Sequence, residues 1–168
     1  MNEDEFDRLV FENQGIIRKI CKAFCPDEEG RKDLFQDILV KLWKGRDLFE
    51  GRSKISTWIY RIGLNEAIDL SRKSKKMMEL HASIDDKMMN KEKYQSADYD
   101  IEALYLAINQ LNPLEKGLIL LHLEQEPYSK ISEVIGISEK NVSVRLVRIK
   151  EKLKKYYLII TGNYHGNE

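Results

Sequence analysis

Apolar residues recur along this 168-residue chain at spacings of three and four, which is the period of an amphipathic α-helix. No segment of strand length alternates apolar and polar residues convincingly. Pro26 ends the first helical pattern, and Asn112 precedes Pro113 as the cap of a later one. The sequence therefore predicts an all-α protein. Its helices are expected over residues 4–25, 29–45, 53–75, 99–111, 114–124, 127–135 and 139–156.

The helical period is lost over residues 77–98, where Met, Asp, Lys, Asn, Gln and Ser dominate. A loop of that length is uncommon inside one compact domain. We therefore expect two small helical domains, residues 1–76 and 99–160, joined by a flexible acidic linker over 77–98. A frayed polar tail over 161–168 is expected to follow.

The ends and composition of the chain give no sign of a membrane or secretory protein. Residues 1–7 are acidic and lack the basic-then-apolar pattern of a secretory signal. No run of about 18 apolar residues occurs, so we expect no insertion into a membrane. The expected location is the cytoplasm.

The charges of the chain sum to zero but are unevenly distributed. Residues 51–80 hold seven Lys and Arg against three Asp and Glu, and residues 139–155 hold seven against two. Acidic residues are in excess over 1–50 and 81–115. Two basic segments separated by an acidic one indicate two contacts with nucleic acid.

Two cysteines, Cys21 and Cys25, lie four residues apart in a helical segment. A structural zinc site needs four ligands, and His81, His122 and His165 are too scattered to supply a second pair. The spacing favours two small buried residues on one helix face, and a redox role is left open. We expect no metal and no cofactor.

The segment from Tyr128 to Leu146 has the pattern of a helix-turn-helix. Gly136 lies where the turn needs a permissive backbone, and Ser138 can cap the second helix. Ser132 is small where the two helices must cross closely. Four residues of the second helix are expected to face inward: Val142, Leu146, Ile149 and Leu153. The outward face is basic, which favours insertion into the major groove of DNA.

A second segment, residues 49–76, mixes aromatic and cationic side chains. Aromatic rings stack on unpaired bases, and cations hold the phosphate backbone. Trp58 and Tyr60 also fit a plain helical core equally well. Asn65 has no apolar reason for its position, so we expect it to contact a base edge.

Two other classes of protein fit parts of these patterns. A conventional helix-turn-helix regulator with a sensor or dimerisation domain explains the C-terminal half but not the Thr57–Ile62 segment and its basic continuation. A nuclease could hold Mg²⁺ on Asp33 and Asp37, which share a helix face, but no third acidic or His residue converges on them. The chain has no phosphate-binding Gly-rich loop and no nucleophile motif, so we expect no enzyme.

Three segments in this order resemble the extracytoplasmic-function group of bacterial sigma factors, and the resemblance covers nearly the whole chain. They are Asp33-Leu-Phe-Gln-Asp-Ile-Leu-Val-Lys-Leu-Trp43, the residues from Phe49 through Ser53 and Trp58 to Asp69, and Leu111-Asn-Pro-Leu-Glu115 followed by the helix-turn-helix. The resemblance implies a transcription initiation factor with core RNA polymerase and promoter DNA as partners. It also implies that an anti-sigma factor can hold the protein inactive.

The resemblance assigns roles to residues of both domains. The helix that binds the polymerase clamp would present Asp33, Gln36, Asp37, Leu42 and Trp43. The side chains that contact the −10 element and its melted strand would be Phe49, Ser53, Lys54, Trp58, Arg61, Asn65, Arg72 and Lys73. The side chains that contact the −35 duplex would be Lys140, Asn141, Ser143, Val144, Arg145, Val147, Arg148 and Lys150.

The second helix of the helix-turn-helix departs from the family pattern. A long cation is replaced by Ser143, and a polar serine by Val144. One fewer cation costs roughly 1–3 kcal/mol of base discrimination. We therefore expect weak or altered −35 recognition, and dependence on an additional DNA-bound partner to reach the promoter.

Overall fold

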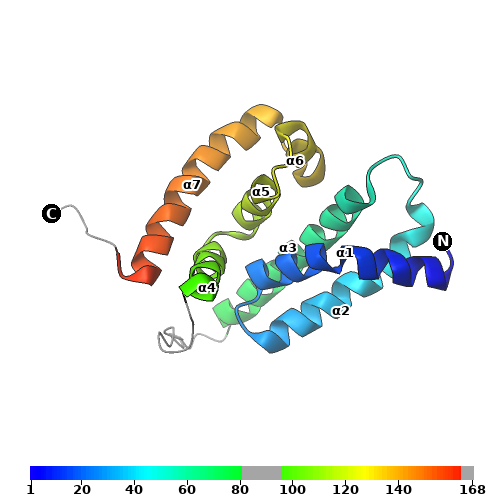
Figure 1. The fold of residues 1–168 in the computed structure, drawn as a ribbon, viewed down its shortest axis with the longest axis horizontal. Helices are drawn as coiled ribbons and strands as arrows, with labels where there is room; N and C mark the ends of the chain where they lie inside the picture. The colour runs from blue at the N-terminus through cyan, green and yellow to red at the C-terminus, as the bar shows by residue number, and fades with distance from the viewer. Residues whose placement is uncertain (81–95, 164–168) are drawn as a thin grey trace.

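The computed structural model describes residues 1–80 and 96–163, and these form seven α-helices and one short 3₁₀ helix, with no strand (Figure 1). The prediction of an all-α protein is confirmed. The elements are α1 (Glu3–Phe24), α2 (Glu28–Gly45), η1 (Arg46–Leu48), α3 (Ile55–Leu80), α4 (Ser96–Asn109), α5 (Pro113–Leu123), α6 (Tyr128–Ile135) and α7 (Glu139–Thr161).

The first unit is a bundle of α1, α2 and α3. A capping box joins Asn2 to Glu5 at the start of α1, and the Asp27 side chain caps α2 by accepting from the Gly30 amide at 2.7 Å. The core is formed by aliphatic side chains at helical spacing with almost no exposed surface, namely Ile17, Ile20, Leu34, Ile38, Leu42, Ile59 and Leu64. Helices α1 and α3 approach closely at Gly63, where a Cβ would lie 2.7 Å from Cδ1 of Ile20. This bundle fixes which faces of α2 and α3 are open.

The second unit contains α4 to α7. Asn112 caps α5 in a capping box with Glu115, and Pro113 occupies the first turn, as the sequence predicts. The long helix α7 packs against α4, α5 and α6. Its four residues expected to face inward are all buried, so that prediction is confirmed.

Three helix ends extend beyond the predicted bounds by three residues or more. α3 continues to Leu80, α4 begins at Ser96, and α7 continues to Thr161 before it ends at Gly162 with φ +74°. The end of α7 is held by tertiary contacts that its local sequence does not encode, since the Tyr157 hydroxyl donates to Asp100 of α4 at 3.0 Å. Most of the expected linker and the end of the expected tail lie outside the described residues.

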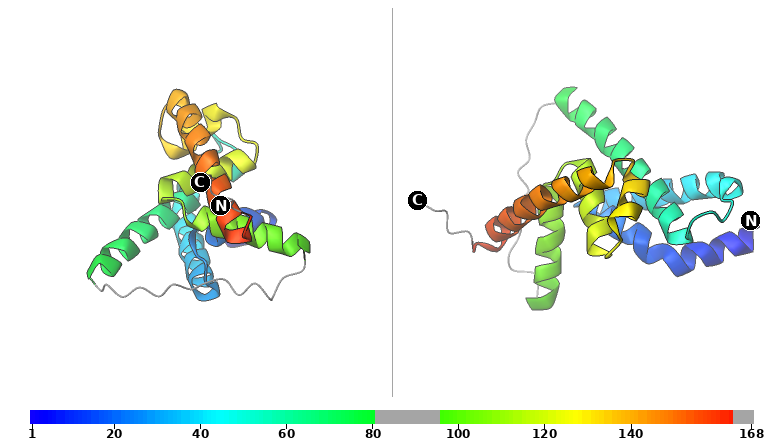
Figure 2. Two further views of the ribbon diagram at one scale, coloured as in Figure 1. Left: turned by 90° about the vertical axis from the view of Figure 1, so that its left-hand side faces the viewer. Right: turned by 90° about the horizontal axis from the view of Figure 1, so that it is seen from above.

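The two units pack against each other, with α1 against α4 and α5, and α3 against α5 and α6 (Figure 2). Gly117 of α5 lies in this domain interface, where a Cβ would be 3.7 Å from Leu64 of α3. Three ion pairs cross the interface, each with the cation on the first unit: Lys19–Glu124, Lys22–Glu102 and Arg61–Glu133. Within the described ranges, no helix has the length and apolar character needed to cross a membrane.

Candidate nucleic-acid interface

The turn between α6 and α7 has the geometry that the sequence predicts. Gly136 ends α6 in the left-handed region at φ +81°, where a side chain would be strained. The Ser138 hydroxyl caps α7 by accepting from the Asn141 amide at 3.2 Å. Sequence analysis treated Ser132 only as a small residue, but its hydroxyl also donates to the Ile137 carbonyl across the turn at 2.5 Å. The turn is therefore held by both local conformation and side-chain hydrogen bonds.

All eight residues of α7 that were assigned to the −35 duplex are exposed. Within the part of the chain that the structure describes, none of their side chains forms an ion pair or a hydrogen bond. The second helix of the helix-turn-helix thus presents an unobstructed face, which fits entry into a major groove about 12 Å wide. Their contacts with DNA stay a prediction.

The residues assigned to the −10 element lie in the loop before α3 and along α3 itself. Lys54, Asn65, Arg72 and Lys73 are exposed. Phe49, Ser53 and Trp58 are half-buried, and the rings of Phe49 and Trp58 pack at 5.1 Å between centroids with a tilt of 43°. The Trp58 ring therefore packs partly within its own domain and keeps part of its surface open.

Tyr60 belongs to the core rather than to the open face. Its side chain is 3% exposed, and burial raises the pKa of its hydroxyl well above the ordinary value. Of the two aromatic residues left open by sequence analysis, only Trp58 retains surface for stacking.

The second unit lies over part of the α3 surface. Nη2 of Arg61 is 3.0 Å from Oε1 of Glu133 on α6. Asn65 and Arg72 line a groove of about 520 Å³ whose opposite wall includes Leu114 of the second unit. In this arrangement the guanidinium of Arg61 is occupied and the exposed Asn65 faces a neighbouring domain. The contact could not be expected from the sequence, because an exposed glutamate on a short helix is ordinarily a solvated side chain.

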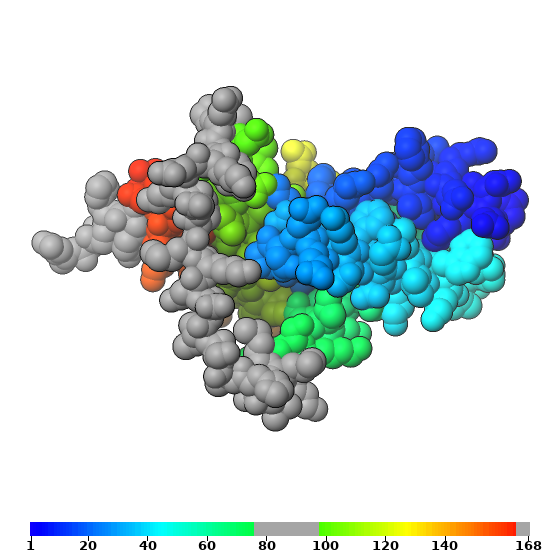
Figure 3. Space-filling model, turned by 90° about the horizontal axis from the view of Figure 1, so that it is seen from below, coloured from blue at the N-terminus to red at the C-terminus, as the bar shows by residue number. Residues whose placement is uncertain are grey.

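The outer face of α2 is open, and atoms of α2, coloured light blue to cyan, lie uncovered on the face seen in Figure 3. Asp33, Gln36 and Asp37 are exposed, and within the described residues neither carboxylate forms an ion pair. Leu42 is fully buried, so it supports the helix from inside and offers no contact surface. The polymerase-binding role of the exposed residues stays a prediction.

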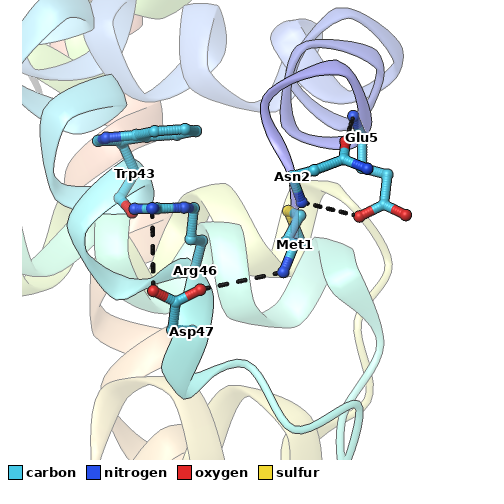
Figure 4. A network of polar contacts seen from close by, with 6 residues as sticks. All are labelled: Met1, Asn2, Glu5, Trp43, Arg46 and Asp47. Atoms are coloured by element: carbon cyan, nitrogen blue, oxygen red, sulfur yellow. Dashed lines mark hydrogen bonds and ion pairs between the residues drawn. The ribbon is translucent and has the colours of Figure 1, made fainter.

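Trp43 is half-buried at the end of α2 and is held by its own domain (Figure 4). The Phe6 ring meets it edge-on at 5.0 Å, and the Arg46 guanidinium lies 3.6 Å from its ring centroid. Arg46 also donates to the Trp43 carbonyl at 2.7 Å. Sequence analysis missed Arg46, although a cation directly after a helix end is a recognisable signal for binding the last carbonyls.

The cysteines are buried and unoxidised in this structure. Burial and the neighbouring Cys25 raise the pKa of the Cys21 thiol to about 12, and burial also raises the pKa of Cys25. Both therefore stay protonated at neutral pH. Among residues 1–80 and 96–163, no group of three or more His, Cys, Asp or Glu side chains is placed to hold a metal ion.

Two family models match the chain in the order of its two units. The model described as Sigma-70 region 2 matches residues 9–77, and the model described as Sigma-70, region 4 matches residues 101–153. The RNA polymerase sigma factor YlaC of Bacillus subtilis is 31% identical over 133 residues, covering 76% of this chain and 77% of the relative. The ECF RNA polymerase sigma factor SigW of the same organism is 22% identical, covering 92% of this chain and 89% of the relative.

The chain belongs to the extracytoplasmic-function group of RNA polymerase sigma factors. It is a transcription initiation factor, and its first and second units are the region 2 and region 4 domains. The family resemblance seen in the three sequence segments is confirmed.

Solved structures of two sigma factors have the same fold as this one. The sigma factor RpoE of Bartonella quintana, in complex with the anti-sigma factor NepR, has a TM-score of 0.73 and 21% identity, covering 90% of this chain and 96% of that chain. CnrH, in complex with the cytosolic domain of CnrY, has a TM-score of 0.67 and 22% identity, covering 97% of this chain and 92% of that chain.

Proposed function

We propose that this sigma factor binds core RNA polymerase through the exposed face of α2, opens the −10 region with α3 and contacts the −35 duplex with α7. The observation that carries this proposal is the open α7 face, on which all eight assigned residues are exposed. Asp33 and Asp37 are exposed on α2 and form no ion pair within the described residues, so they support a partner surface of complementary charge.

The same face of α7 supports a weakened −35 contact. Ser143, Val144 and Val147 occupy exposed positions where longer polar side chains could fork onto base edges. Arg148 is the bidentate donor nearest to them. Discrimination between bases by hydrogen bonding is therefore low for a factor of this kind, and an additional DNA-bound partner supplies the missing promoter affinity.

The protein is proposed to act in the cytoplasm, where polymerase and chromosome are found, and without catalytic chemistry of its own. An anti-sigma factor is a proposed further partner. Of the two solved neighbours, RpoE is in complex with the anti-sigma factor NepR, and CnrH is in complex with the cytosolic domain of CnrY. Such a partner would compete with polymerase or DNA for the surfaces described above.

The direct test mixes the full chain with core polymerase and measures co-elution and start-site-specific transcripts. Asp37→Arg is expected to lower core affinity by about tenfold, because it reverses a charge at the contact. Glu29→Arg is the matched control, since Glu29 is exposed on the same helix outside the assigned residues, and it should change affinity by less than about twofold.

Two results would contradict the proposal. A chain that binds duplex DNA stably without any affinity for core polymerase is a conventional regulator. Efficient transcription with core polymerase alone, governed by a defined −35 sequence, rules out the need for an additional DNA-bound partner.

A further inference from the structure

The outward face of α7 contains two exposed aliphatic residues. Val144 is 46% exposed and Val147 is 56% exposed. At 100° per residue, Val144 lies directly opposite the buried stripe of Val142, Leu146 and Ile149, and Val147 lies one turn further on beside it. Branched aliphatic residues at the most exposed positions gain nothing from packing and lower helix propensity slightly.

Polar side chains surround this pair on the same face. Lys140, Arg148 and Glu151 are exposed at helical positions next to the valines. Within the described residues, none of these three side chains forms an ion pair, so no internal salt bridge accounts for them. The two valines therefore form the apolar centre of a charged, DNA-facing helix surface.

The major groove offers one apolar group to such a surface. The C5-methyl of thymine projects into the groove, whereas cytosine presents an amino donor and no methyl. Val144 and Val147 have neither donor nor acceptor, so they cannot recognise a base edge by hydrogen bonding. They can bury methyl groups, and each methyl buried is worth about a fourfold change in affinity.

We propose that Val144 and Val147 are specificity-determining residues that select thymine in the −35 element through its methyl group. This inference rests on the proposed function, in which α7 enters the −35 major groove. Three residues of helix advance about 4.5 Å, and successive base pairs advance about 3.4 Å. The two valines therefore select thymines at adjacent or next-neighbouring base pairs, on either strand, while Arg148 supplies hydrogen bonds nearby.

The test starts from the holoenzyme, made from the full chain and core polymerase, and a promoter library randomised across the −35 region. Selected promoters are expected to be enriched in thymine at two neighbouring positions. Each selected thymine is then replaced by deoxyuridine, which removes only the C5-methyl. Promoter affinity should fall about fourfold for each methyl removed.

Variants then assign each methyl to its side chain. Val147→Ala should weaken binding to the thymine promoter about fourfold and leave binding to the matching deoxyuridine promoter unchanged. Val144→Ala should do the same at the other position. Ile159→Ala is the matched control, because Ile159 is also a branched aliphatic residue, 51% exposed on α7 but near its far end. It should leave the ratio between thymine and deoxyuridine promoters unchanged.

Three results overturn the inference, and they can be told apart. Promoter selection that depends on the −35 sequence but is indifferent to deoxyuridine overturns methyl recognition and leaves the proposed function standing. A library with no −35 enrichment overturns the −35 contact itself, and the inference with it. If Val147→Ala weakens binding to the thymine promoter and to the deoxyuridine promoter equally, the valines are assigned to a protein contact. This result also overturns methyl recognition.

Discussion

The region 4 domain presents its assigned DNA-binding residues on an open face of α7, whereas the region 2 domain presents part of its set towards the other domain. On α7 the assigned side chains are exposed and make no ion pair within the described residues. On α3, Arg61 is paired with Glu133, and Asn65 lines a groove closed on one side by the region 4 domain. The difference lies in accessibility more than in the chemistry of the side chains.

The difference in accessibility affects how each domain can reach DNA. In the arrangement described, α7 can meet duplex DNA at once, whereas Arg61, whose side chain is 43% exposed, must first leave Glu133 to reach a melted strand. All three ion pairs across the interface have partly exposed side chains, and pairs of this kind contribute only about 0.2–1 kcal/mol each and weaken with salt. The ion pairs therefore add little to the interface, which is held mainly by apolar packing, because buried residues of both units belong to one hydrophobic core.

The largest expected effect concerns the α3 surface. Trp58→Ala combined with Asn65→Ala should lower open-complex formation about 100-fold, because each stacking or base-edge contact with a melted strand is worth about 1–3 kcal/mol. Permanganate reactivity of −10 thymines measures the melting. Because Trp58 also packs on Phe49, thermal unfolding must accompany the test, and Asn65→Ala alone should cost about tenfold with the fold intact.

Ser74→Ala, an exposed change on the same helix, serves as the control and should leave melting unaltered. Unimpaired melting in the double variant would remove the −10 assignment from α3.

A smaller effect is expected at the domain interface. Glu133→Arg replaces the Arg61 pair by a repulsion, so the population of separated domains should rise about fivefold, for a change of about 1 kcal/mol. Small-angle scattering of the free protein measures the separation as a larger radius of gyration. Raising the salt concentration should move the wild type in the same direction.

The charge swap, Glu133→Arg with Arg61→Glu, restores an attractive pair and should return scattering to the wild-type profile. If the single variant scatters like the wild type, the ion pair does not contribute to closure.

The smallest expected effect is a pH dependence at the same interface. Lys116 is 7% exposed with its ammonium 5.1 Å from the Phe24 ring centroid, and burial lowers its pKa. The folded protein then loses this proton at a lower pH than the unfolded chain. Stability should therefore rise with pH between the lowered pKa and the ordinary value of 10.5.

Urea unfolding of the wild type and Lys116→Met at pH 8 and pH 10 isolates this effect from other titrating groups. The wild type should gain stability relative to the variant as the pH rises from 8 to 10. Parallel pH profiles for the two proteins would show that Lys116 is as well solvated when folded as when unfolded.

Much of the fold follows from local patterns that the sequence displays. The αL turn at Gly136, the Ser138 cap and the inward stripe of α7 are each specified by residues within a few positions of one another. Helix ends were less predictable where they depend on distant contacts. Near the end of α7, Tyr157 donates a hydrogen bond to Asp100, which lies 57 residues away in the chain.

The candidate site divides in the same way. The exposed face of α7 could be deduced from its sequence, because a helix with one buried stripe must present the opposite residues to solvent. The burial of Leu42 follows from the bundle, although the family resemblance groups it with contact residues. The stacking of Arg46 on Trp43 depends on how the chain turns after α2, which the hydrophobic period does not specify.

The sequence by itself determined an all-α sigma factor with two helical domains, a helix-turn-helix and the side chains available to polymerase and DNA. Only the tertiary structure decided that region 4 packs against region 2, and that Arg61 is paired with Glu133. The physical reason is that helical periods and caps are short-range. The contact between Arg61 and Glu133 joins residues 72 positions apart through the packing of the two domains.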